Sequence, residues 1–411
     1  MSAIAFALPE DVAAARDGIL AFVDHEVLPR HARHADLLDD PRARYREDGR
    51  YRDEVLALIR EVRMAAAAAG YFQMCTPTAL GGGGLGHLAY FVAWEALFHH
   101  CGPRHWLMLY ALAHWAFGPS RMLEKITDEA RDRVMAGLMD GSRSMCFGLS
   151  EPNAGSDAAM ITTRAVADGT GWRLSGRKIW TTNAPTADYC VVFAVTDGER
   201  ARAKQGGISA FLVPTAAAGF RVERVIRLFG HVGGDEAEIA LDEVVVKPWQ
   251  LVGELHEGFR AALYGVSLGR VYNAARAVGY GRWALERALE HATRREAFGA
   301  PIANYQGVSF PLAESATELH AAHLMGLNAA SLLDQGEGAV KELSMAKAYA
   351  VQVGFRAVDR AMQVHGAMGF TNELGLTEAW HALRVVNVAD GTNEILNRTI
   401  AQRLFKGDTA L

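Results

Sequence analysis

Two short segments in the middle of the sequence carry residue types that suit a phosphate-bearing or heterocyclic ligand. The first runs from Phe147 to Asp157 and reads Phe-Gly-Leu-Ser-Glu-Pro-Asn-Ala-Gly-Ser-Asp. Its hydroxyls and free backbone N–H groups suit a pyrophosphate or the polar edge of a ring. The second reads Lys-Ile-Trp-Thr-Thr-Asn at 178–183, where a tryptophan and two threonines on a strand offer one apolar plane and two hydroxyls. Taken alone, the first is equally a surface turn, and the spacing of the second favours a half-buried strand.

Other groupings of reactive residues are weaker candidates. His99-His100-Cys101 and His31-x-x-His34 have no partner set at metal-ligand spacing, so we interpret them as a helix face and an exposed loop. The glycine run at 81–84 follows no β-branched strand and precedes no Gly-Lys-Ser/Thr, which favours a flexible turn between helices over a phosphate loop. The four cysteines are far apart and form no Cys-x-x-Cys pair, which predicts buried reduced thiols and no metal site.

Composition excludes several classes of protein. The formal net charge of -5 argues against a nucleic-acid partner. The most apolar later stretch, at 105–118, is too short to span a bilayer, so we expect no membrane span. No basic region precedes the short apolar start at Met1–Leu8, so we expect no secretory signal and a cytoplasmic protein.

The elements that must position these segments fall into three parts, so the predicted fold class is α+β multidomain. We expect an N-terminal helical domain at 1–145, a central antiparallel β-barrel or sandwich domain at 146–255, and a C-terminal four-helix-bundle domain at 256–411. Helical spacing marks 51–69 and 90–98 in the first part. Strand-like runs mark 189–195, 208–213, 220–225 and 237–246 in the second. Long amphipathic stretches at 283–295, 308–333 and 340–365 suit a helix bundle.

Together the two ligand-binding candidates and three further segments resemble the acyl-CoA dehydrogenase family over almost the whole chain. Glu-Pro-Asn-Ala-Gly-Ser-Asp followed by Lys-x-Trp-x-Thr-Asn is similar to the flavin-binding β domain of that family. The segments at 294–306, 363–370 and 390–395 resemble its Arg-x-x-Phe-Gly…Gln, Gln-x-x-Gly-Gly-x-Gly-Phe and Glu-Gly-Thr-x-x-Ile elements, in the same order. The resemblance implies an FAD-dependent oxidoreductase of fatty acid metabolism that acts on an acyl-CoA.

The resemblance also implies a role for each matching residue. Phe147, Leu149, Ser150, Ser156, Trp180 and Thr182 would bind the flavin and its pyrophosphate, with Trp180 against the isoalloxazine and Thr182 near flavin N5. Arg295, Phe298, Gln306, Gln363, Gly366 and Ala367 would reach the FAD that is bound mainly by a neighbouring subunit, and Thr392 and Glu394 would contact FAD again. Ser156, Arg270 and Gly391 would contact the acyl-CoA. A helix-surface ion pair is the alternative role for Arg270. The expected partners are an electron-transfer flavoprotein, with oxygen as the alternative electron acceptor, and further copies of the chain in a homodimer or homotetramer.

The expected catalytic base departs from the family pattern. Family chemistry removes the α-proton of an acyl-CoA with a carboxylate, usually a glutamate, while the β-hydrogen leaves as hydride. This sequence has Asp390 at that position, and the alternative location, just before Arg270, holds Gly269. Asp390 is therefore the one carboxylate at either location, and its neighbours Val388 and Ala389 suggest a dry site that raises the pKa of a base.

Aspartate reaches about 1 to 1.5 Å less far than glutamate, and a misplacement of that size can cost roughly a hundredfold in rate. Ala389 replaces a residue that is bulkier in many relatives, which fits either a branched, cyclic or otherwise bulky acyl group or mere drift within the family. Three functions remain open: a dehydrogenase that uses Asp390, a nitroalkane oxidase-like or monooxygenase enzyme with the same flavin fold, and a non-catalytic homologous subunit. Arg270, Ser156 and the nearly complete flavin set favour the first.

Overall fold

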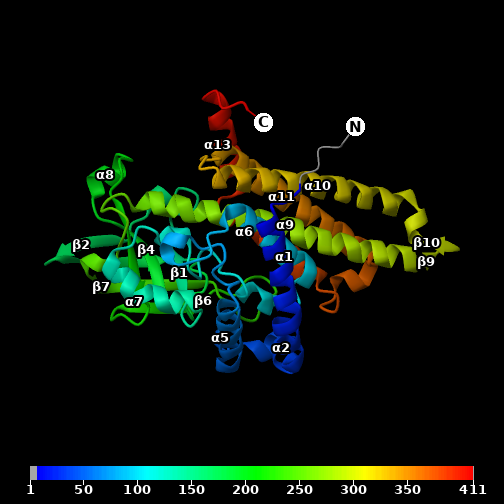
Figure 1. The fold of residues 1–411 in the computed structure, drawn as a ribbon, viewed down its shortest axis with the longest axis horizontal. Helices are drawn as coiled ribbons and strands as arrows, with labels where there is room; N and C mark the ends of the chain where they lie inside the picture. The colour runs from blue at the N-terminus through cyan, green and yellow to red at the C-terminus, as the bar shows by residue number, and fades with distance from the viewer. Residues whose placement is uncertain (1–6, 411) are drawn as a thin grey trace. The chain divides into compact units, whose positions relative to one another are not determined.

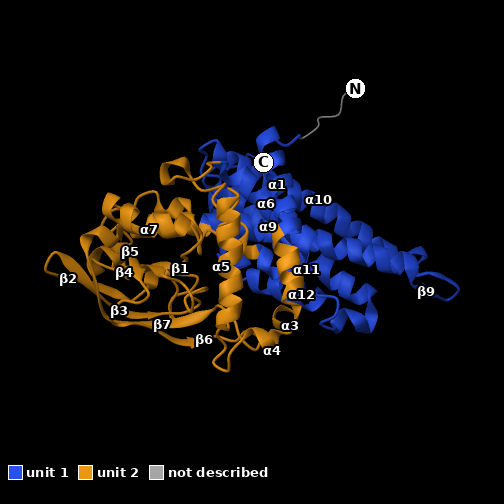
Figure 2. Cartoon of the chain, turned by 60° about the horizontal axis from the view of Figure 1, so that its bottom comes forward, with its two compact units in different colours: residues 1–25, 85–108, 267–411 blue, residues 26–84, 109–266 orange. Residues whose placement is uncertain are grey.

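The computed structural model describes residues 7–410, which form two compact units. Unit 1 comprises residues 1–25, 85–108 and 267–411, and unit 2 comprises residues 26–84 and 109–266 (Figure 2). The expectation about a secretory signal depends on the apolar start at 1–8. Most of this segment lies outside the described residues. Because the units interleave along the sequence, they do not follow the three predicted domains, whose boundaries at 145 and 255 stay a prediction.

Unit 2 is built around one mixed β-sheet (Figure 1). Its strands pair in the order β6-β7-β3-β2-β4-β5-β8, and β1 pairs with β4. The strands are β1 (Met145–Gly148), β2 (Arg164–Asp168), β3 (Gly171–Lys178), β4 (Tyr189–Val195), β5 (Ile208–Pro214), β6 (Phe220–Val225), β7 (Ala237–Val246) and β8 (Leu251–Val252). Most neighbours are antiparallel, as expected, but β1 and the first residue of β2, Arg164, pair in parallel with β4. The β1–β4 ladder pairs Met145 with Tyr189, and it places the start of the predicted flavin loop at the sheet.

Strand β4 lies in the interior of this sheet, and it is apolar on both faces. Val191 and Phe193 pack into one core with helix α7 (Asp128–Met139), and Cys190 and Val192 pack into a second core on the other face. A continuous apolar run is the pattern of a strand that is covered on both sides. The remaining helices of unit 2 are α2 (Leu28–Arg33), α3 (Ala35–Leu38), α4 (Pro41–Arg44), α5 (Asp53–Ala68) and α8 (Gly198–Arg202).

Unit 1 is helical, with one two-stranded hairpin. Its elements are α1 (Glu10–Phe22), α6 (Gly86–Cys101), α9 (Gly258–Arg294), β9 (Glu296–Ala297), β10 (Ala300–Pro301), α10 (Gln306–Asp334), α11 (Val340–Val364), α12 (Leu376–Val386) and α13 (Asn393–Phe405). Helix α9 has 37 residues, and its part from Ser267 onward belongs to unit 1. Helices α9 and α11 pack closely because Gly354 has no side chain, and a Cβ there would lie 2.3 Å from the carbonyl oxygen of Ala277.

The predicted order of helices, then strands, then helices is confirmed. The glycine run at 81–84 does connect a 3-10 turn to α6, but close packing rather than flexibility requires it. A Cβ on Gly82 would lie 2.2 Å from the carbonyl oxygen of Thr76. No helix within residues 7–410 is long and apolar enough to cross a membrane.

Candidate active site

Asp390 occupies a tight turn between α12 and α13 of unit 1. Its φ is +52° and that of Gly391 is +96°, so two consecutive residues adopt the left-handed conformation. A residue with a side chain pays about 1 to 2 kcal/mol for that conformation. Two cations fix the turn: Arg270 Nε donates to the carbonyl of Asp390 at 3.2 Å, and Lys347 Nζ donates to the carbonyl of Gly391 at 2.9 Å. Strain held in this way is typical of functional sites.

The carboxylate of Asp390 lies against α9. Oδ2 accepts a hydrogen bond from Nδ2 of Asn273 at 2.7 Å, and Asn273 is 3% exposed. Gly269, one helical turn earlier on the same face, leaves the space that this carboxylate fills. A Cβ at position 269 would lie 2.3 Å from Oδ2 and 2.6 Å from Cγ. Gly269 cannot act as a base because it has no side chain. The structure adds that a side chain at this position would exclude the carboxylate of Asp390.

The electrostatic environment makes Asp390 a suitable base near neutral pH. Burial raises the pKa of Asp390 to about 6, although Lys347, Arg270 and the Asn273 hydrogen bond each favour the charged form. Burial also lowers the pKa of Lys347 to about 8 and lowers the pKa of Arg270. Val388 is 59% exposed, so this apolar neighbour does not shield the carboxylate from water. The carboxylate of Asp390 is desolvated because its turn packs against α9 and α11, a contact that the sequence does not indicate.

Arg270 is half-buried beside this turn, and it also lies 3.5 Å from Ser344 Oγ. Among the described residues it therefore forms no helix-surface ion pair, which was the alternative role. Within residues 7–410, no acceptor is bound to the backbone N–H of Asp390. An unbound N–H next to a base is the type of donor that stabilises developing negative charge on a carbonyl oxygen.

In unit 2 the predicted flavin segment begins on β1 and continues in the loop after it. The side chains of Phe147 and Leu149 pack into the sheet core, so these residues can offer a ligand mainly their backbone groups. The side-chain hydroxyls of Ser150 and Ser156 have no hydrogen-bond partner within residues 7–410, and Ser156 is exposed. Gly155 faces open space. The loop can therefore donate to an added polar group, which fits the pyrophosphate expected from the sequence.

Trp180 and Thr182 lie just beyond β3, not on a strand as predicted. Trp180 has a φ of +60° and its side chain is 53% exposed, a large fraction for so apolar a ring. The Thr182 hydroxyl has no partner among the described residues, and neither does the buried Oγ1 of the adjacent Thr181. An exposed indole beside unsatisfied hydroxyls fits a planar heterocycle such as a flavin ring.

A buried ion pair that sequence reasoning missed connects the two flavin segments. Lys178 is fully buried, and its Nζ donates to Glu151 at 2.8 Å and to the carbonyl of Leu149 at 3.1 Å. Glu151 also accepts from the backbone N–H and hydroxyl groups of Thr162 and Thr163 at 2.5 to 2.9 Å. Despite burial, these partners lower the pKa of Glu151 to about 2, and burial lowers the pKa of Lys178 to about 8. Both residues were visible in the motifs, but nothing in their spacing indicated that they pair.

The residues expected to reach a neighbouring subunit lie in unit 1, and most of them are exposed. Phe298 is 98% exposed on the β9–β10 hairpin, which Figure 1 shows at the ends of α9 and α10. Arg295 precedes this hairpin, Gln306 begins α10, and the exposed Gln363, Gly366 and Ala367 lie at and beyond the end of α11. Thr392 caps α13 by accepting from the N–H of Ile395, and Glu394 is exposed in the first turn. The nearly complete exposure of Phe298 leaves its ring available to a partner surface.

The histidine candidates pair with carboxylates. His99 lies 2.7 Å from Glu286 and His100 lies 2.6 Å from Asp24, while His31 is buried in α2, 2.8 Å from Asp39, and is not in an exposed loop. No cluster suited to a metal ion is found within residues 7–410.

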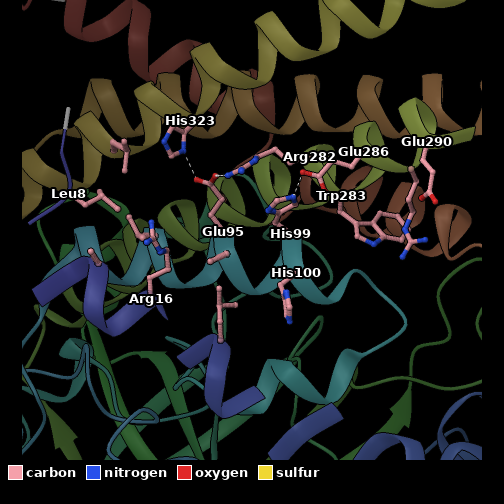
Figure 3. Close-up of a pocket in the computed structure, with 16 residues that line it drawn as sticks. Leu8, Arg16, Glu95, His99, His100, Arg282, Trp283, Glu286, Glu290 and His323 are labelled. Carbon is pink, nitrogen blue, oxygen red and sulfur yellow. Dashed lines mark hydrogen bonds and ion pairs between the residues drawn. The ribbon is translucent and has the colours of Figure 1, made fainter. Parts of the chain in front are cut away.

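His99 and His100 also line a pocket of about 930 Å³ on unit 1 (Figure 3). In this pocket the carboxylate of Glu95 accepts a hydrogen bond from Arg282 at 2.8 Å and lies 2.7 Å from the ring of His323. These contacts connect α6, α9 and α10 to one another. None of the expected site residues lines this pocket.

Comparison with known proteins gives three family matches and many relatives. The chain matches "Acyl-CoA dehydrogenase, N-terminal domain" at 9–142, "middle domain" at 146–244 and "C-terminal domain" at 256–405. It is 32% identical to a 3-(aryl)acrylate reductase of Clostridium sporogenes over 86% of this chain and 92% of that one. It is 32% identical to a caffeyl-CoA reductase-Etf complex subunit of Acetobacterium woodii over 88% and 92%. Among solved structures, butyryl-CoA dehydrogenase from Megasphaera elsdenii has a TM-score of 0.82 at 25% identity, covering 98% of this chain and 100% of that one.

Proposed function

The chain belongs to the acyl-CoA dehydrogenase family, and from that premise we propose that it dehydrogenates an acyl-CoA at the α and β carbons with Asp390 as the base. It is an oxidoreductase, and its cofactor is FAD. The identity of the base and of the acyl group belongs to the proposal.

The environment of Asp390 is the observation that carries this proposal. A carboxyl group whose pKa is about 6 is largely ionised at neutral pH, yet it is far more basic than an ordinary aspartate. General-base efficiency is highest when the pKa of the base lies near the working pH. A degenerate, non-catalytic subunit has no need for a strained turn whose two carbonyl groups are fixed by a buried lysine and a half-buried arginine.

Other residues of this chain would bind the cofactor, bind the substrate and hold the base in place. Phe147, Leu149, Ser150, Ser156, Trp180 and Thr182 would hold the FAD, which supplies the hydride acceptor when it is bound. Asp390 would take the α-proton, and its backbone N–H would donate to the thioester carbonyl as negative charge develops there. Arg270 and Gly391 would line the acyl-CoA side of the same turn. Lys347 would keep this turn in place and favour the ionised carboxylate before proton transfer.

A bulky acyl group, in particular an aryl-substituted one, is the substrate class that we favour. Ala389 offers less bulk beside the base than many relatives do, and two relatives have names that refer to arylacrylate or caffeyl-CoA reduction. The relative named as a subunit of a caffeyl-CoA reductase-Etf complex supports an electron-transfer flavoprotein as the electron acceptor.

A second copy of the chain would complete each FAD site. The exposure of Phe298, Gln306 and the segment at 363–367 supports this arrangement, since each is available to a partner. We propose a homodimer at least, with a homotetramer as the larger assembly.

Anaerobic flavin reduction tests the proposed function. The purified holoenzyme is mixed with straight-chain, branched, cyclic and aryl acyl-CoAs, with nitroalkanes as a control, and loss of the oxidised flavin absorbance is followed. Reduction by one acyl-CoA class, abolished by Asp390→Asn with FAD still bound, is the expected result. Reduction by a nitroalkane alone, or undiminished reduction in Asp390→Asn, would refute the proposal.

A further inference from the structure

Helix α9 carries two residues, one turn apart, that together form a recess for the side chain of Asp390. Gly269 leaves room for the carboxylate, and Asn273 donates to one of its oxygens at 2.7 Å. Positions i and i+4 of a helix lie on one face, so both residues face the same carboxylate. No family role carried over from the sequence includes Asn273.

The two oxygens of Asp390 are not equivalent in this recess. Oδ2 is bound to Asn273 and would lie within 2.3 Å of any Cβ at position 269. Oδ1 accepts no hydrogen bond from any residue within 7–410. An amide N–H2 group can only donate, and a charged carboxylate oxygen can only accept, so this contact favours the ionised form.

From this geometry we infer that Asn273 is a positioning residue that binds Oδ2 of Asp390 and leaves Oδ1 as the atom that takes the substrate proton. The inference rests on the proposed role of Asp390 as base. A short carboxylate that could rotate freely would present either oxygen in many orientations. One strong hydrogen bond to a buried amide restricts it to a single orientation, which offsets part of the loss in reach.

The consequence is a defined effect on protonation. Removal of the Asn273 donor takes away one of the contacts that hold the pKa of Asp390 down, while burial and the two cations remain. The midpoint of Asp390 protonation should therefore rise by about one pH unit, the size expected for one hydrogen bond to a charged group. An aspartate at 273 should raise it further, because two adjacent carboxyl groups resist ionising together.

The test compares Asn273→Leu and Asn273→Asp with the wild-type holoenzyme and with Asn328→Leu, an exposed position on α10. The infrared band of the protonated Asp390 carboxyl is first identified by its absence in Asp390→Asn and is then titrated in each variant, with no substrate present. The acid limb of kcat/KM is measured for the acyl-CoA that the wild type oxidises fastest. FAD content and thermal midpoint show whether each variant is folded.

The expected result is an upward shift of about one pH unit in both the infrared midpoint and the acid limb for Asn273→Leu, a larger shift for Asn273→Asp, and no shift for Asn328→Leu. At pH 6.5, kcat/KM of Asn273→Leu should fall roughly threefold. An infrared midpoint equal to that of the wild type in a folded, FAD-loaded Asn273→Leu protein would overturn the inference. If the infrared midpoint shifts but Asp390→Asn keeps its activity, then the Asn273 contact is real and it is the proposed base that is wrong.

Discussion

Gly269→Ala adds one methyl group at the point where α9 meets the carboxylate of Asp390. The new Cβ would lie 2.3 Å from Oδ2 and 2.6 Å from Cγ, where ordinary contact begins at 3.4 Å. The carboxylate must therefore move by about 1 Å, which also stretches the 2.7 Å bond from Asn273 beyond hydrogen-bonding range. A displacement of that size costs roughly a hundredfold in rate. Alanine is the better helix former by about 0.5 to 1 kcal/mol, which offsets part of the cost of the added bulk, so we expect the variant to fold.

The assay is stopped-flow flavin reduction under anaerobic conditions, with FAD content and thermal midpoint measured on the same samples. Gly338→Ala is the matched control, because a Cβ there would meet a single atom at 4.0 Å. We expect a fall of roughly a hundredfold in kcat/KM for Gly269→Ala and no change for Gly338→Ala. A second consequence is non-additivity: once the carboxylate has left Asn273, the further change Asn273→Leu should add little. Wild-type activity in a folded, FAD-loaded Gly269→Ala protein would refute the recess that we describe.

Three further predictions concern the same two sites. The folded pKa of Asp390, about 6, is above its ordinary 3.8, so the charged form costs stability above pH 6 and the cost disappears below 3.8. Asp390→Asn should therefore raise the free energy of unfolding at pH 8 by on the order of 1 to 3 kcal/mol and leave it unchanged at pH 3.5, as urea denaturation would show. Lys347→Met removes a cation that lowers the pKa of Asp390, so the acid limb of kcat/KM should move to higher pH; an unmoved limb would count against this electrostatic role. Glu151→Gln leaves Lys178 buried without its counter-ion and should lower stability by about 3 to 5 kcal/mol and weaken FAD binding, whereas Glu151→Gln with Lys178→Met should recover part of both. Equal FAD dissociation constants in the wild type and Glu151→Gln would contradict a positioning role for the pair.

The sequence predicted the elements better than the contacts between them. Strands β4, β6 and β7 begin and end at the predicted residues because each is an apolar or alternating run with turn residues on both sides. The prediction that Trp180 lies on a strand was wrong. The residue follows β3 and turns left-handed, and no pattern in Lys-Ile-Trp-Thr-Thr-Asn indicates this.

The site residues were likewise easier to predict from the sequence than the contacts between them. Asp390 and Gly269 could be singled out from the sequence because a family pattern marks both positions, but their physical relation could not. The expected dryness around Asp390 was attributed to Val388 and Ala389, whereas Val388 is mostly exposed and the desolvation arises from residues far away in sequence. Asn273 and Lys347 were missed because each is an ordinary polar residue on a long helix. The one available signal for Asn273 was its place four residues after Gly269, on the same helical face.

The short base and the missing side chain on α9 are best understood as one feature. A glutamate at 390 would extend the carboxylate by one methylene, and in this turn the space next to Oδ2 already ends at the backbone of Gly269. A larger residue at 269 would occupy the place of the carboxylate in the same way. Aspartate at 390, glycine at 269 and asparagine at 273 therefore fit one another: the first provides the carboxylate, the second the room and the third the orientation. Asp390 is therefore the carboxylate that fits the recess of α9. Aspartate reaches less far toward the substrate than glutamate, and the fixed orientation that Asn273 gives its carboxylate offsets part of that loss.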